Sequence, residues 1–270
     1  MMADLKWNPV AEGYSRKFFE GPDTTLSFID FGGGGFPVLA LHGHMNEGLF
    51  AQDLARTLAG EYRVIALDQR GHGESGRPLS YDNERYVDDA LALLDHLGID
   101  ETVLLGHSLG GVVAYRLAAR RPERVRALII EDIGAVVNDN LSFTGRWPRR
   151  MPTKEALIAA LGRVGPAFAY SMREYGDGWG LPFVPEDMAV SQRHLNGDHW
   201  DDWLATDCPA LLLHGMRSTC LSYDQAEEMA SRRPNTKLVH FEAGHSIHFD
   251  ALDPFIEAIQ AFLKSIRTEQ

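Results

Sequence analysis

The sequence has few cysteines, no excess of positive charge and no long apolar run. Two Cys among 270 residues cannot build a disulfide framework, which favours a reduced, cytoplasmic protein. The formal net charge is −12, which disfavours binding to nucleic acids or anionic lipids because their phosphates are repelled. No stretch approaches the roughly 18 apolar residues of a membrane span, and the N-terminus lacks the order of a signal peptide. We therefore expect neither nucleic acid nor membrane as a partner.

The remaining composition is that of a globular chain, with 44% hydrophobic and 10% aromatic residues. An alternating segment at 25–31 predicts a half-buried strand. Short apolar runs predict buried parallel strands at 37–42, 62–68, 102–106, 125–131, 210–214 and 237–241. Amphipathic segments predict helices at 84–97, 111–121, 222–232 and 252–266. This alternation predicts an α/β three-layer sandwich with a mostly parallel sheet.

Residues 133–205 interrupt this alternation. They contain no clear strand pattern and hold four of the five tryptophans. We predict a helical cap at 133–205, inserted into a core domain that comprises residues 1–132 and 206–270.

Residues 106–110 read GHSLG, a match to the pattern G-x-S-x-G. The match follows the strand predicted at 102–106 and precedes the helix predicted at 111–121. Such a strand-to-helix elbow holds the serine in a strained turn, with its hydroxyl at the carboxyl edge of the sheet. Ser108 is therefore the candidate nucleophile. A serine hydroxyl needs a base, and His245 follows the last predicted strand at the same edge.

The chain resembles the α/β-hydrolase superfamily, in its branch of small serine esterases that carry a cap. The resemblance runs from about residue 24 to 266 and is most specific at HG (42–43), DQRGHGES (68–75), the serine elbow and GH (244–245). It implies an eight-stranded, mostly parallel sheet with a helical cap inserted after the strand that follows the elbow helix. It also implies a serine–acid–histidine triad that works without a metal or a cofactor.

The resemblance places the oxyanion hole at two backbone N–H groups, those of His44 and Leu109. Two such donors aimed at a tetrahedral oxyanion stabilise the transition state by a few kcal/mol. His248 is the alternative to His245 as the catalytic histidine. Otherwise, we expect it to line the pocket.

The acid departs from the commonest pattern of the superfamily. Many relatives carry it in a G-x-x-D loop after the strand at 210–214, but here that loop ends in Ser218. Other relatives carry it one strand earlier, where Asp132 stands in this chain. Asp132 is therefore the predicted acid, with Glu131 and Asp224 as alternatives. We expect Ser218 to form a hydrogen bond with Asp132 or His245.

These residues predict hydrolysis of a small carboxylic ester or a related acyl bond. Trp147 and Trp179 are candidates for an apolar acyl pocket under the cap, although bulky residues also serve to anchor such a lid. Two other readings stay open: a ligand-binding or signalling protein with little turnover, and a C–C bond hydrolase or cofactor-free perhydrolase with the same triad.

Overall fold

The computed structural model describes residues 5–7, 14 and 16–268. Its main sheet has eight strands in the order β13-β12-β7-β6-β4-β5-β3-β2. Only β3 runs against its neighbours within this sheet, which confirms the mostly parallel arrangement. The strands are β2 (Arg16–Glu20), β3 (Thr25–Asp30), β4 (Phe36–Leu41), β5 (Tyr62–Asp68), β6 (Thr102–His107), β7 (Val125–Glu131), β12 (Ala210–Gly215) and β13 (Thr236–Phe241).

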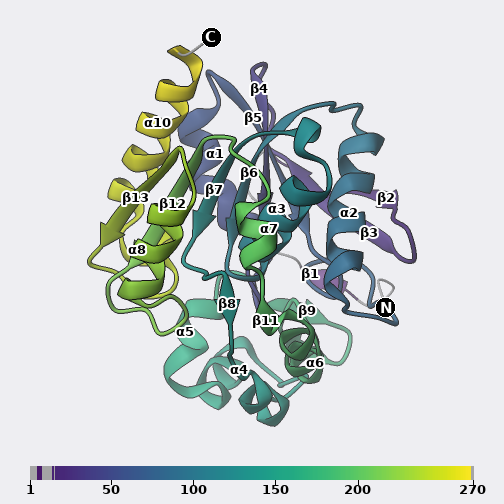
Figure 1. The fold of residues 1–270 in the computed structure, drawn as a ribbon. Coiled ribbons are helices and arrows are strands. Elements are labelled where there is room, and N and C mark those ends of the chain that lie inside the picture. The colour runs from purple at the N-terminus through teal and green to yellow at the C-terminus, as the bar shows by residue number, and fades with distance from the viewer. Residues whose placement is uncertain (1–4, 8–13, 15, 269–270) are drawn as a thin grey trace.

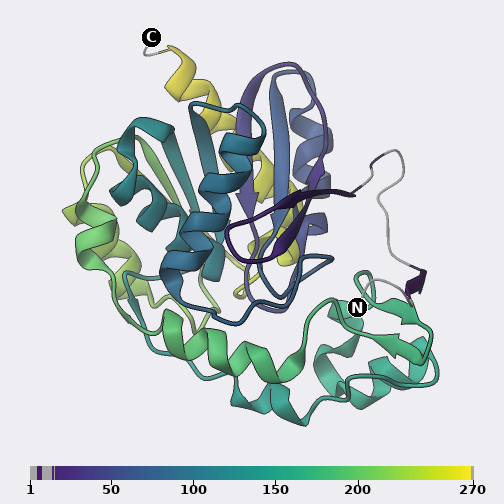
Figure 2. The ribbon, with the colours of Figure 1, turned by 90° about the vertical axis from the view of Figure 1, so that its right-hand side faces the viewer.

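Helices cover both faces of the sheet because alternate strand residues point to opposite sides. In β4, for example, Leu39 packs in the layer of α2 (Asn83–His96), α3 (Leu109–Arg120) and α8 (Tyr223–Arg232). Its neighbour Val38 packs in the layer of α1 (Gln52–Leu58) and α10 (Leu252–Thr268). Figures 1 and 2 show the resulting three-layer sandwich, which confirms the predicted fold class.

Strand β2 was not predicted from the sequence. It lies at the edge of the sheet, where the segment RKFFE buries only Phe19 fully. Since one face of an edge strand meets solvent, its sequence lacks the apolar run that marks the central strands.

The segment between β7 and β12 folds into short elements around a small apolar core of its own. Figure 2 shows α4, α5 and α6 lying apart from the helices that cover the sheet. The helical elements are η4 (Ser142–Arg146), α4 (Lys154–Ala160), η5 (Gly162–Val164), α5 (Gly165–Phe168), α6 (Pro185–Leu195) and α7 (Trp200–Leu204).

The expectation that residues 133–205 contain no strand is wrong. The segment holds β8 (Val136–Val137), β9 (Arg173–Tyr175), β10 (Gly178–Gly180) and β11 (Gly197–Asp198), and β9 also pairs with β1 (Leu5–Trp7). Strands of two or three residues are too short to give an alternating pattern. The boundaries of the cap at residues 133 and 205 stay a prediction. Among the described residues, no helix is both long and apolar enough to cross a lipid bilayer.

Trp203 in α7 joins the end of the insertion to the core. Its ring is fully buried, and its indole N–H donates a hydrogen bond to the carbonyl of Met229 at 3.0 Å.

We predict that Trp203→Ala lowers the free energy of unfolding by about 3–5 kcal/mol, because the substitution empties a buried site. Trp200→Ala is the matched control, since this half-buried ring lies against Arg232 and its loss should cost only about 1 kcal/mol. Urea unfolding followed by circular dichroism measures both, and equal losses would contradict the prediction.

Candidate active site

Ser108 occupies the predicted elbow between β6 and α3. Its backbone has φ 52° and ψ −119°, an unfavourable region for a residue other than glycine. A Cβ atom on Gly106 would lie 2.2 Å from the carbonyl oxygen of Gly110, so the turn has no room for a side chain there. The backbone amide of Ser108 donates a hydrogen bond to the carbonyl of Glu131 at 3.0 Å, which connects the elbow to the neighbouring strand β7.

The loop that follows β4, residues 42–47, lies directly against this elbow. A Cβ atom on Gly43 would come within 3.0 Å of the Cβ atom of Ser108, and one on Gly110 within 2.0 Å of the carbonyl oxygen of Leu41. The two predicted oxyanion donors, the amides of His44 and Leu109, therefore belong to segments that touch beside the serine.

Asp132 leaves the sheet directly after β7, also with a positive φ of 52°. Its buried carboxylate accepts hydrogen bonds from His245 Nδ1 and from the amide of Gly215, both at 2.8 Å. The Ser218 hydroxyl donates to the same carboxylate, as expected from the sequence. The structure thus brings together Asp132 and His245, two of the three predicted triad residues.

His245 lies on the loop between β13 and α9 (Ile247–Asp250), beside the elbow. Its carbonyl accepts a hydrogen bond from His107 Nε2 at 3.0 Å, and the two rings are 4.7 Å apart. Its side chain is 32% exposed, and among the described residues its ring forms no hydrogen bond with Ser108. Such bonds are often longer in an enzyme without substrate.

The charge state of His245 is set by competing effects. Burial opposes a positive charge on the ring, but hydrogen bonds with Asp132 and with Cys220 outweigh it and raise its pKa. Burial lowers the pKa of His44 to about 3, with a further contribution from His42. These effects favour the uptake of a proton by His245, whereas the His44 ring stays neutral.

Glu131, the alternative acid, contacts a different histidine. Its buried carboxylate accepts from the backbone amide of His248 at 3.0 Å and from Nδ1 of that ring at 2.8 Å. His107, Glu131 and His248 form a group in which the atoms that could bind a metal ion lie within 4.8 Å of one another. The contacts with His248 already satisfy the carboxylate of Glu131. His107 was not among the site residues predicted from the sequence, although its position directly before Ser108 is a signal for it.

The cavity beside Ser108 is lined mainly by polar residues, and neither Trp147 nor Trp179 belongs to its lining. Its wall includes Gln192 from α6, Asp139, and Cys220 from the loop after β12. Trp147 packs instead against Phe143 and Phe168 within the insertion. A substrate-binding role for these tryptophans stays a prediction, as does that of His248, whose side chain is buried.

The Asp132 carboxylate accounts for much of the elevated pKa of His245. We predict that Asp132→Asn lowers this pKa by about 1–3 pH units, because the amide cannot stabilise the imidazolium by its charge. The pH dependence of the His245 ring resonance in NMR spectra, assigned with His245→Gln, measures the change. Ser218→Ala keeps the carboxylate and serves as the control, in which the pKa should not fall. An unchanged pKa in Asp132→Asn would contradict the prediction.

Known proteins are similar to this chain in sequence and in fold. The family model of the alpha/beta hydrolase fold matches residues 32–175. A fluoroacetate dehalogenase from Burkholderia sp. is 33% identical to this chain over 95% of the chain and 96% of its own length. The structure of E-2-(acetamidomethylene)succinate hydrolase is similar in fold, with a TM-score of 0.84 at 24% identity over 93% of this chain and 99% of that one. A thermophilic esterase from Thermogutta terrifontis gives a TM-score of 0.75 at 27% identity over 93% and 99% of the two chains. The chain therefore belongs to the alpha/beta hydrolase family.

Proposed function

We propose that this hydrolase cleaves a small carboxylic ester or a related acyl bond through a triad of Ser108, His245 and Asp132. The observation that carries the proposal is the 2.8 Å contact between His245 Nδ1 and the buried Asp132 carboxylate, beside a serine held in a strained elbow. A carboxylate at this distance fixes which ring nitrogen carries the proton and leaves Nε2 as the base.

The reaction begins when Ser108 Oγ attacks the acyl carbon and its proton passes to Nε2 of His245. The amides of His44 and Leu109 bind the oxyanion of the tetrahedral intermediate. The intermediate expels the alcohol, which takes the proton from His245, and the acyl group remains on Ser108. A water molecule, deprotonated by His245, then attacks the acyl-enzyme and releases the acid and the free serine.

The identity of the nucleophile separates this proposal from the chemistry named for the dehalogenase relative. Displacement of a halide by a serine oxygen would leave a stable ether on the enzyme, which water cannot readily cleave. Attack of the same oxygen on an acyl carbon leaves an ester, which water can cleave with the help of His245. Ser108 therefore favours acyl transfer over dehalogenation.

The esterase relative is consistent with acyl transfer, and the cavity beside Ser108 suggests a small substrate with polar groups. Polar residues such as Asn138, Gln192 and Thr219 offer hydrogen-bond partners to such groups.

We predict that wild type gains the mass of one adduct when it is exposed to a serine-reactive organophosphonate, and that Ser108→Ala gains none. Asp132→Asn should react about 10³–10⁴ times more slowly, because the base loses its orientation and charge support. Intact-mass spectrometry over time measures the rates.

Glu131→Gln is the matched control, because it makes the same change at the adjacent carboxylate. It should slow the reaction by less than about 10-fold, since Glu131 contacts His248 rather than His245. Rapid labelling of Asp132→Asn would reject Asp132 as the acid. An unlabelled wild type would reject the triad and favour a ligand-binding protein.

A further inference from the structure

We infer that the cap positions the oxyanion loop, residues 42–47, and that Glu47, Arg173 and Ser191 are positioning residues for the reaction. The inference rests on the proposed function, because it assigns these side chains to the alignment of the His44 amide.

Contacts from the core hold both ends of this loop. At its start, Nε2 of His42 accepts from the amide of Gln69 at 3.0 Å, while Nδ1 donates to the carbonyl of Gly43 at 2.7 Å. After its end, the amide of Gly48 donates to the carboxylate of Asp68 at 2.8 Å.

Between these ends, the loop is held by side chains from two separate parts of the cap. Nε2 of His44 is 2.8 Å from the hydroxyl of Ser191 in α6, which in turn is 2.7 Å from the hydroxyl of Tyr86. The hydroxyl of Tyr170, which precedes β9, donates to the side-chain oxygen of Asn46.

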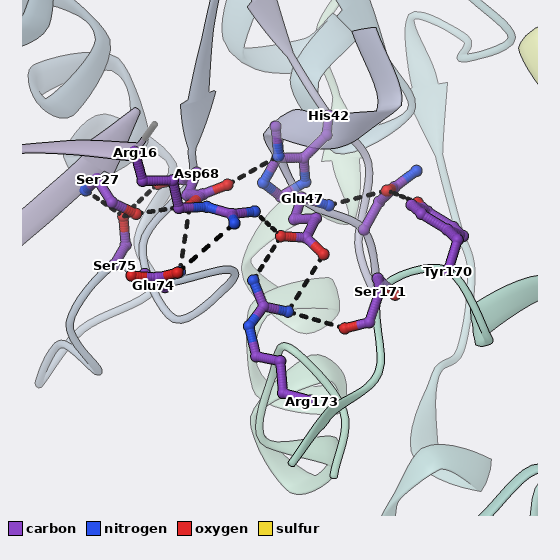
Figure 3. Close-up of polar contacts among 12 residues, drawn as sticks. Arg16, Ser27, His42, Glu47, Asp68, Glu74, Ser75, Tyr170, Ser171 and Arg173 are labelled. Carbon is purple, nitrogen blue, oxygen red and sulfur yellow. Dashed lines mark hydrogen bonds and ion pairs between the residues drawn. The ribbon is translucent and has the colours of Figure 1, made fainter. Parts of the chain in front are cut away.

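The third contact is an ion pair that is buried at the junction of cap and core. Arg173 in β9 donates to both carboxylate oxygens of Glu47, at 2.6 and 3.2 Å, and the two side chains are 1% and 0% exposed. Figure 3 shows the carboxylate of Glu47 between the guanidinium groups of Arg173 and Arg16. Arg16 also pairs with Asp68 at 2.7 Å and with Glu74 at 3.5 Å, so it forms ion pairs with three carboxylates.

The loop needs this support because its own backbone is strained. Met45, between the residues that contact the cap, has a φ of 64°, which is unfavourable for a side chain of this kind. A strained segment keeps its conformation only when its surroundings hold it, and the contacts from the cap supply this constraint. The cap thereby holds the His44 amide at the elbow.

Another ion pair between the cap and the core provides a control. Arg77 donates to both carboxylate oxygens of Asp187 in α6 at 2.6 Å, and the hydroxyl of Tyr81 donates to the same group at 2.7 Å. None of these contacts involves residues 42–47. Arg77→Gln thus weakens the attachment of the cap without removing a contact to the oxyanion loop.

The experiment is steady-state hydrolysis of p-nitrophenyl acetate by wild type, Glu47→Gln, Arg173→Gln, the double variant and Arg77→Gln. Misplacement of an oxyanion donor acts on the transition state, so kcat should fall about 10–100-fold while KM changes by less than about threefold. The double variant should lose no more than the worse single variant, because both substitutions break the same contact. Arg77→Gln should keep kcat within about threefold of wild type.

Ser191→Ala tests the inference without disturbing the buried charges. It removes the partner of the His44 ring, and kcat should fall at least about threefold with little change in KM, even where the Glu47 and Arg173 variants fail to fold. Thermal unfolding identifies the folded variants. The inference is overturned if folded Glu47→Gln, Arg173→Gln and Ser191→Ala keep the wild-type kcat, or if Arg77→Gln loses as much as they do. Absence of turnover in wild type itself would reject the proposed function, and this inference with it.

Discussion

The register between β6 and β7 is the constraint on which the site depends. These parallel strands pair His107 with Glu131, so the residues that follow, Ser108 and Asp132, leave the sheet next to each other. Both have a φ of 52°, which turns the chain out of the sheet at the same edge. A shift of either strand by one residue would turn its side chains to the opposite face of the sheet. The hydrogen bonds between β6 and β7 therefore hold the strained backbone at these two positions in place.

Burial and local partners separate the histidines at this edge into two kinds. Burial lowers the pKa of His42 to about 4 and that of His107 to about 3, and their hydrogen bonds run to backbone groups. These rings stay neutral and fix the loops around the serine. Among these three, only His245 has partners that outweigh burial: its ring forms a hydrogen bond with the Asp132 carboxylate, and its pKa is raised. The same residue type thus serves as a structural group in two places and as a candidate base in the third.

The sequence predicted the central strands and the elbow closely, because local patterns determine them. The run at 125–131, for example, coincides with β7, and the pattern G-x-S-x-G marks the turn at Ser108. The contact between Glu47 and Arg173 had no such signal, since these residues lie 126 positions apart and meet only in the fold. Trp147 was equally difficult to interpret. An aromatic residue gives the same sequence pattern whether it packs within the insertion or lines a pocket.

Buried charges join the insertion between β7 and β12 to the core of the molecule. Although burial disfavours its charge, Asp68 has a pKa of about 2, because Arg16 and the Ser27 hydroxyl stabilise its ionised form. Arg16 shares its guanidinium between Asp68 and Glu47, whereas Arg173 donates to both carboxylate oxygens of Glu47. Removing one partner of a buried pair costs about 3–5 kcal/mol, because the remaining charge is left buried without compensation. In the proposed mechanism, the buried pair of Glu47 and Arg173 keeps the oxyanion loop aligned before substrate arrives, which reduces the reorganisation that the reaction itself must supply.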